Sequence, residues 1–446
     1  MPAQRRRVIH PSRSVALLFA VLILIGTLLL RLPVASADMS STDWLTALFT
    51  AVSAVCVTGL VIVDTGTYWS PFGQAVVLGL FQLGGFGLMT AAALLGLWVN
   101  RSLRLRARLL TQAETHSLGL GDVAGVARVV LVVTVVCETA LGAVLTLRLH
   151  AAHGLPWGEA AWSGLFHAVS AFNNAGFSLH GDSLMRYAGD AGVLVPVMLG
   201  IVIGGLGFPV LQDLRARWRD PRHWSLHTKI TLAGSAALLL GGMLALLVFE
   251  WSNPRTLGPM AVGDKLLSAA FGSVSARTAG FNSVDIGALS HESWALHYLL
   301  MFIGGGSGGT AGGVKVSTVA ILLLLVVAEV RGRTDSEAFG RRIGAPAQRQ
   351  AITVLVLGSA MIVLGTLVLL RSTDLPTDQV IFEVISAFGT VGLSTGITAQ
   401  LPPAGQLMLV LLMFVGRVGT ITLATSLAMG ERRRGWRLPE EHPVVG

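Results

Sequence analysis

A short segment near the end of the chain has the residue types needed to bind a dehydrated cation through its backbone. Residues 389–396 read Gly-Thr-Val-Gly-Leu-Ser-Thr-Gly, between a short apolar run at 380–388 and a long one at 407–429. In a selectivity filter, backbone carbonyl oxygens replace the water shell of the ion. These carbonyls must point at one axis, which places some residues at positive φ, where glycine sits without strain. The segment therefore predicts a filter at Thr390, Val391 and Gly392.

The same phrase, a Ser-Ala pair followed by a glycine and an apolar residue, occurs four times at nearly constant spacing. Self-similarity of this kind indicates a repeated structural unit. Close packing of small residues in a membrane is the alternative explanation. That alternative does not require the Ser-Ala pair and the gap to recur ahead of each glycine. The other predicted filter residues are Val57, Thr58 and Gly59 in the first unit, Asn174, Ala175 and Gly176 in the second, and Thr278, Ala279 and Gly280 in the third.

A second glycine-rich phrase follows each predicted filter, and the third one is extended. Seven of the ten residues at 304–313 are glycine, inside the otherwise apolar segment 294–327. Each glycine costs about 1 kcal/mol in a helix interior, so the segment predicts a broken helix with a loop inside the membrane. A helix crossing packed on small residues is the alternative. The loop residues are Gly304, Gly305, Gly306, Ser307, Gly308, Gly309, Thr310, Ala311, Gly312 and Gly313.

Two cations accompany this loop. Arg417 stands where the other units have Gly85, Gly205 and Gly305. A guanidinium has five donors, and a loop without helical bonding has bare carbonyls, so we expect Arg417 to donate to the loop and to repel entering cations. A structural contact that only holds the helices together is the alternative. Lys315 lies two residues after the loop. Its side chain could contact the loop or reach the membrane surface, and the sequence leaves both roles open.

Three further polar residues lie in apolar surroundings. Glu138 is in the middle of a predicted membrane helix, and we expect it to accept hydrogen bonds from a neighbouring short helix, since buried carboxylates need partners. His167 and Glu383 precede the second and fourth predicted filters. We expect them to stabilise the helices on which they lie rather than to contact the ion.

Composition and charge predict the membrane segments that position these residues. Of the 446 residues 53% are hydrophobic and 13% are charged, about half the charged share of a soluble domain. The chain is therefore predicted to be an integral membrane protein. Its net charge of +8 comes largely from basic clusters at 5–13, 101–108, 215–229, 331–349 and 432–437. All five clusters fall on one side if the chain crosses eight times, which places both termini in the cytoplasm. Cys56 and Cys137 lie in predicted membrane segments and indicate no disulfide framework.

The predicted fold is an all-α integral membrane protein in which residues 1–446 form a single pore domain. Four repeats, each a helix, a short re-entrant pore helix and a second helix, surround a pseudo-fourfold pore. They give eight transmembrane helices and four pore helices, since non-helical backbone survives at membrane depth only where it is buried or lines a wet cavity. The predicted repeats are 14–100, 124–218, 227–330 and 346–430. A cleaved signal peptide is the alternative for the first apolar run, because Ala35-Ser36-Ala37 follows it.

These motifs carry a resemblance to a known family. The chain resembles the membrane subunits of the Ktr/Trk/HKT superfamily of potassium transporters over nearly its whole length, and is most similar to the KtrB-like branch. The matching segments are 57–60 with 63–65, 172–177, 276–282, 308–315 and 382–396. The two extra N-terminal helices of TrkH-type members are missing from the sequence, which favours the KtrB-like branch.

The resemblance implies the ion, the gate and the partners. A serine at the first filter glycine goes with sodium-preferring plant members, so Gly59 favours K⁺, although Na⁺ dependence is common in the family. The resemblance makes the loop at 304–313, with Lys315 and Arg417, the gate. It implies a homodimer in the cell membrane that is regulated by a cytoplasmic, nucleotide-binding RCK ring of the KtrA type.

Two other classes of protein are considered. A sodium-coupled or sodium-conducting secondary transporter also has broken helices, but inverted repeats are usual there, whereas these four run in one direction. A membrane enzyme would need acidic or histidine clusters near a membrane surface. The glycine-rich loop lacks the Lys-Ser/Thr ending of a phosphate-binding loop, and no catalytic triad is recognisable. An enzyme is therefore not predicted.

Overall fold

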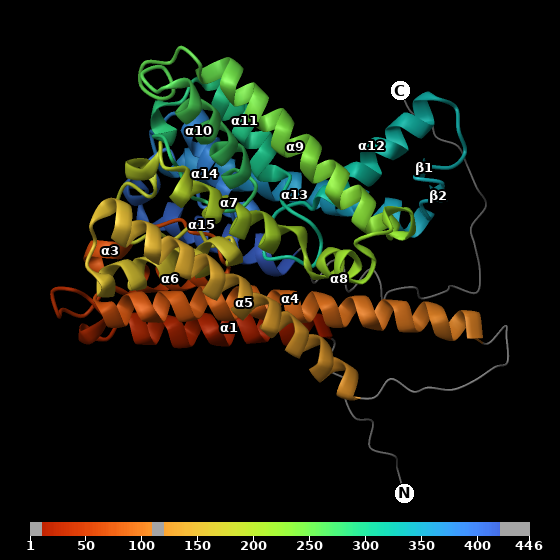
Figure 1. Cartoon of the computed structure of the whole chain (residues 1–446), viewed down its shortest axis with the longest axis horizontal. Helices are drawn as coiled ribbons and strands as arrows, with labels where there is room; N and C mark the ends of the chain where they lie inside the picture. Colours follow the sequence, from red (N-terminus) through yellow and green to blue (C-terminus); the bar gives the residue numbers. More distant parts are fainter. Residues whose placement is uncertain (1–10, 109–119, 420–446) are drawn as a thin grey trace, which may run out of the picture.

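The computed structural model describes residues 11–108 and 120–419, and this part of the chain is almost entirely helical (Figure 1). The first segment contains α1 (Pro11–Leu30), η1 (Pro33–Ala35), α2 (Trp44–Val55), α3 (Thr65–Tyr68) and α4 (Pro71–Arg108). The second contains α5 (Leu120–His153), α6 (Trp157–Asn173), η2 (Met185–Tyr187), α7 (Ala191–Leu206), α8 (Phe208–Arg217) and η3 (Pro221–His223).

The third segment contains α9 (Leu226–Glu250), α10 (Val262–Ser275), η4 (Ile286–Ala288), α11 (His291–Phe302) and α12 (Val316–Val330). The fourth begins with the antiparallel pair β1 (Glu337–Ala338) and β2 (Arg341–Arg342) and continues with α13 (Ala345–Ser372), α14 (Thr377–Gly389), η5 (Thr398–Gln400), α15 (Pro403–Phe414) and the π-helical turn η6 (Val415–Gly419). The basic clusters at 5–13 and 432–437 lie wholly or largely outside the described residues, as does the end of the apolar run at 407–429.

The short helices have local signals that fix where they begin and end. The Asp43 carboxylate caps α2 by accepting a hydrogen bond from the backbone N–H of Leu45 at 2.9 Å. The C-cap residues of helices α6 and α14 are Asn174 and Thr390, which both adopt the left-handed conformation. These two short helices therefore stop directly at a predicted filter.

The four segments pack on one another in a closed cycle. In every case the helix that follows the filter of one segment contacts the short helix of the next: α4 contacts α6, α7 contacts α10, α11 contacts α14, and α15 contacts α2. Figure 1 shows α1 and α4 side by side along one edge and α9 along the opposite edge. The cyclic packing brings the ends of all four short helices toward a common centre.

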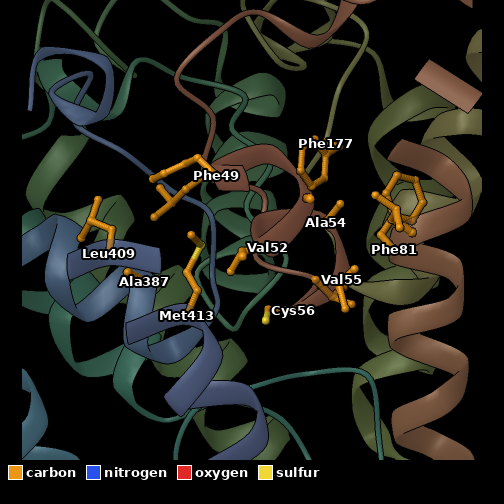
Figure 2. Packing of buried hydrophobic residues seen from close by; sticks show 14 of the residues in the cluster. Phe49, Val52, Ala54, Val55, Cys56, Phe81, Phe177, Ala387, Leu409 and Met413 are labelled. Atoms are coloured by element: carbon orange, nitrogen blue, oxygen red, sulfur yellow. The ribbon is translucent and has the colours of Figure 1, made fainter. Parts of the chain in front are cut away.

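Apolar side chains hold the first segment to the fourth and to the second. Figure 2 shows Val52 of α2 facing Leu409 and Met413 of α15, while Val55 lies on the side of Phe81 in α4. These side chains are at most 2% exposed. Burial of each such side chain contributes about 1.5–3 kcal/mol, so the short helix is fixed from both sides.

By length and composition, three helices of the described chain could cross a membrane: Ala127–His153, Leu226–Glu250 and Ala345–Ser372. Helices α7 and α8 would give a fourth if they form one span. The two helices bend by 96° at the break between them. This number counts the described residues alone and is smaller than the eight crossings predicted for the whole chain. The reason in two cases is a glycine break, at Gly207 and at 304–313, which divides a long apolar run into shorter helices.

Large apolar side chains cover the outside of the long helices. Leu244 and Val248 of α9, Leu323 of α12 and Leu367 of α13 are each at least 61% exposed. Soluble proteins rarely expose contiguous apolar surface of this kind. The described surface is therefore suited to contact with lipid.

Candidate functional site

The four predicted filters share one unusual backbone conformation. The residue two positions before each filter glycine has positive φ, the next residue does not, and the glycine again does. The angles are 55° at Val57 and 87° at Gly59, 56° at Asn174 and 70° at Gly176, 74° at Thr278 and 79° at Gly280, and 49° at Thr390 and 96° at Gly392. Positive φ is a genuine outlier for β-branched residues such as Val57, Thr278 and Thr390. Such strain clusters at functional sites.

The four glycines form a ring, which we call the glycine ring. A β-carbon built on Gly59 would lie 2.4 Å from the carbonyl oxygen of Ala175, and one on Gly176 would lie 2.8 Å from that of Ala279. A β-carbon on Gly280 would lie 2.4 Å from the carbonyl oxygen of Val391, and one on Gly392 would lie 2.2 Å from that of Thr58. Each filter glycine therefore lies against the middle filter residue of the next loop, and the glycine of the fourth loop lies against the middle residue of the first. Real side chains do not fit at these distances, so all four positions require glycine.

The serine of each Ser-Ala pair holds its filter in place. The hydroxyl oxygens of Ser53 and Ser386 accept from the backbone N–H of Gly59 and of Gly392, both at 3.1 Å. In the other two units the hydroxyl donates instead, from Ser170 to the Phe177 carbonyl at 2.8 Å and from Ser275 to that of Phe281. All four serines are fully buried. These bonds explain why the phrase recurs, a reason that sequence reasoning did not supply.

His167 and Glu383 occupy equivalent positions, three residues before the serine, and both brace the chain beyond the filter. The Nε2 atom of His167 lies 2.9 Å from Ser178 Oγ, while its Nδ1 lies 2.7 Å from the Ser163 carbonyl. Glu383 accepts from the Ser394 hydroxyl and, at 3.1 Å, from the Thr395 N–H. The expectation that both residues act as supports agrees with these contacts, although they hold the loop after the filter as well as the short helix.

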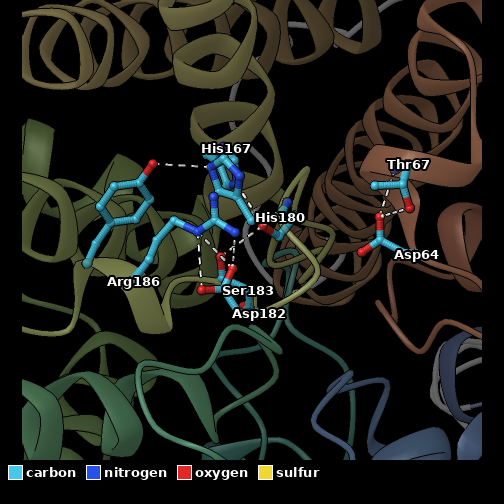
Figure 3. Close-up of polar contacts among 9 residues, drawn as sticks. Asp64, Thr67, His167, His180, Asp182, Ser183 and Arg186 are labelled. Atoms are coloured by element: carbon cyan, nitrogen blue, oxygen red, sulfur yellow. Dashed lines mark hydrogen bonds and ion pairs between the residues drawn. The ribbon is translucent and has the colours of Figure 1, made fainter. Parts of the chain in front are cut away.

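A polar cluster follows the second predicted filter in the chain and lies against His167. Figure 3 shows His167 against His180, whose ring centroids are 5.2 Å apart, with Arg186 and Asp182 beside them. Arg186 pairs with Asp182 at 2.7 Å. Burial, and then the positive charge of Arg186, lower the pKa of His180. The imidazole is therefore neutral at neutral pH and adds no positive charge near the second filter.

The glycine-rich loop interrupts its helix, as the sequence predicts. Helix α11 ends at Phe302 and α12 begins at Val316. The loop docks on the broken helix of the second segment: the N–H groups of Gly306 and Thr310 donate to the carbonyls of Gly205 and Gly204, at 2.8 and 3.1 Å. In return, the Phe208 N–H donates to the Gly308 carbonyl at 3.1 Å.

The break between α7 and α8 makes this docking possible, and sequence reasoning did not identify it. Gly207 has a φ of 93°, and a β-carbon on it would lie 2.6 Å from the Ser307 carbonyl oxygen. The available signal was the sequence Gly207-Phe208-Pro209, because proline favours the first turn of a new helix.

Both predicted loop cations contact the loop. Arg417 is 1% exposed, and its Nη1 donates to the Thr310 carbonyl at 2.5 Å. The Lys315 ammonium donates to the carbonyls of Ala311 and, at 3.3 Å, Gly312. The predicted bond from Arg417 to the loop is confirmed. For Lys315 the contacts favour the loop over the membrane surface.

Glu138 also has the partners expected of it. Its two carboxylate oxygens accept from Asn173 Nδ2 and from Gln82 Nε2, both at 3.0 Å. Asn173 is the last residue of α6, so the predicted hydrogen bond from a short helix is confirmed. Through these bonds α5 is tied to α4 and to the second filter.

Sequence reasoning missed one buried charge. Arg277, the residue directly before the third filter, is 7% exposed and donates to Ser235 Oγ and to the Gly304 carbonyl, both at 3.2 Å. A charged residue next to a predicted filter in an apolar segment was a usable signal.

Comparison with known proteins gives consistent matches over the whole chain. The cation transport protein family TrkH matches residues 2–436. The chain is 40% identical to the Ktr system potassium uptake protein B of Bacillus subtilis, covering 95% of this chain and 94% of the relative. It is 36% identical to the potassium/sodium uptake protein NtpJ of Enterococcus hirae, covering 100% and 99%. The crystal structure of the potassium transporter TrkH from Vibrio parahaemolyticus matches with a TM-score of 0.71 and 18% identity, covering 95% and 86%.

Proposed function

Because the chain belongs to the TrkH family of cation transport proteins, we propose that it is the membrane subunit of a potassium uptake system. In this proposal K⁺ passes along the axis of the glycine ring, where it exchanges its water shell for backbone carbonyls from four loops. The observation that carries the proposal is the closed contact of each filter with the next. A ring of this kind needs four equivalent loops, and the repeats at 14–100, 124–218, 227–330 and 346–430 supply them.

We propose that the glycine-rich loop is the gate below this filter. Its backbone lies against Gly204 and Gly205 of α7, and the cations Arg417 and Lys315 hold its carbonyls. Glycine permits the loop to adopt other backbone conformations at small cost. A loop fixed by a few hydrogen bonds and free of large side chains can switch between two positions, as a gate requires.

The regulator and the assembly form a further part of the proposal. We propose, from the resemblance of the motifs, that the subunit works as a homodimer with a cytoplasmic RCK ring of the KtrA type. Relatives named as proteins of a Ktr system support a membrane subunit that works as part of a system. The basic residues at 215–229 and 331–349 offer a positively charged surface for this contact. A ring that binds there would lie close to the helices that flank the gate.

A sodium-dependent activity is the second candidate, because one relative is named a potassium/sodium uptake protein. Purified protein in liposomes distinguishes the two candidates. We expect rubidium, which substitutes for K⁺, to enter at a much higher rate than sodium, since backbone carbonyls from four loops set the preference. Equal or greater sodium flux would replace the potassium proposal with the sodium alternative, and flux of neither ion would refute both.

The proposed orientation, with cytoplasmic termini, is tested by labelling in intact cells. In a Cys137→Ser background the remaining Cys56 is fully buried, so introduced thiols report alone. A cysteine at Ser102 or Gly435 should resist a membrane-impermeant thiol reagent, whereas one at Asp182 should react, because basic clusters stay inside. Permeabilised cells, in which all three sites should react, are the control. Labelling of Ser102→Cys without permeabilisation would contradict the orientation.

A further inference from the structure

Arg277 is a buried cation whose partners are all neutral. It is 7% exposed, and its Nη2 donates to the Ser235 hydroxyl and to the Gly304 carbonyl, both at 3.2 Å. Among the side chains that the structure describes, no carboxylate forms an ion pair with it. Burying a charge without an opposite charge is costly. A residue retained at this cost in a chain that transports cations calls for a role other than packing.

The backbone and the side chain of Arg277 contact different parts of the proposed pathway. Its backbone leads directly into the third filter, since the next residue is Thr278 with a φ of 74°. Its side chain contacts Gly304, the first residue of the glycine-rich loop. A β-carbon on Gly304 would also lie 3.3 Å from Thr278 Cγ2, so the loop begins directly behind this filter.

The third filter is the one that a cation precedes. The residues at the equivalent position before the other filters are Cys56, Asn173 and Gly389, and none of them is a cation. The guanidinium lies beside a cavity of about 20 Å³ between α7 and α9, which Gly205, Ser235 and Gly305 also line. A cavity of this size holds about one water molecule. A water molecule at this position could accept a hydrogen bond from Arg277 when the bond to Gly304 is absent.

We propose that Arg277 is a positioning residue that couples the glycine-rich loop to the third filter. When the loop leaves its docked position, Gly304 moves, the hydrogen bond to Arg277 breaks, and the main chain at Thr278 loses its support. The K⁺ preference of the filter thus depends on the position of the loop. This inference rests on the proposed function and adds a residue to it.

A double-mutant cycle in liposomes tests the coupling, with the rubidium-to-sodium flux ratio as the measurement. Arg277→Met removes the hydrogen bond to Gly304 and should lower the ratio by roughly tenfold. Arg277→Lys keeps a donor and should restore most of it. Ser235→Ala removes only the other partner and should leave the ratio nearly unchanged.

The second arm of the cycle uses Arg417→Ala, which releases the loop. If the loop acts on the filter through Arg277, adding Arg277→Met to Arg417→Ala should lower the ratio little further, whereas independent structural effects would add. An unchanged ratio in Arg277→Met, or full additivity in the double variant, overturns the coupling. If Arg277→Met does not accumulate, Arg277→Gln enters the same cycle. Absence of rubidium flux in the wild-type protein would instead refute the proposed function.

Discussion

Gly392→Ser is expected to lower the rubidium-to-sodium flux ratio by at least roughly tenfold, the change that about 1.4 kcal/mol produces. Gly392 has a φ of 96°, and a β-carbon there would lie 2.2 Å from the Thr58 carbonyl oxygen. The substitution therefore strains its own backbone and also displaces a carbonyl of the first filter. Since the number and direction of carbonyls set the preference, discrimination should fall while flux persists.

The chain offers a matched control four residues further on. Gly396 has a φ of 93°, but a β-carbon on it would meet nothing within 4 Å. Gly396→Ser has the same backbone strain, about 1–2 kcal/mol, without the clash, and should keep the wild-type ratio. Gly176→Ser should fall between the two, because its nearest carbonyl oxygen is 2.8 Å away. If Gly392→Ser and Gly396→Ser give equal ratios, the glycine ring does not select the ion.

Arg417→Ala is expected to raise potassium flux several-fold and to weaken the response to the cytoplasmic regulator. The guanidinium is 1% exposed and donates to the Thr310 carbonyl at 2.5 Å. Losing a charged hydrogen bond of this kind costs about 1.5–3 kcal/mol, which shifts the loop away from its docked position. Removal of the charge also lowers the barrier to an entering cation. Rubidium uptake into liposomes, with and without the regulator, measures both effects.

Arg417→Lys separates the two contributions. Lysine keeps the charge but loses the planar fork of donors, so its flux should lie between those of the wild type and Arg417→Ala. Arg371→Ala is the control, since this arginine is exposed at the end of α13. A protein that loses expression in Arg417→Ala and shows unchanged flux in Arg417→Lys would make Arg417 a structural contact only.

Local patterns were sufficient to predict the parts of the site that lie within one segment. The loop at 304–313 could be predicted because a helix cannot absorb seven glycines in ten residues. The filter glycines could be predicted because a backbone that turns its carbonyls to one axis needs positive φ.

Contacts between segments could not be predicted in the same way. Thr310 and Arg417 are 107 residues apart in the chain, and their bond exists because two segments dock. The same holds for the support of the loop by α7, whose break at Gly207 has little meaning until the loop is placed against it. The contact of Arg417 with the loop could be predicted because the constant spacing of the repeats places the loop and the helix of Arg417 at the same depth.

The four glycines of the glycine ring belong to one polypeptide, so each is encoded by its own codon. In a pore made of four identical subunits, one altered codon changes all four sides of the filter at once. Here one altered codon changes Gly59, Gly176, Gly280 or Gly392 and leaves the other three sides intact. The residues that support the predicted filters already differ: His167 supports the second and Glu383 supports the fourth. Under the proposed function, a single substitution therefore alters one side of the filter and leaves the carbonyls of the other three sides in place.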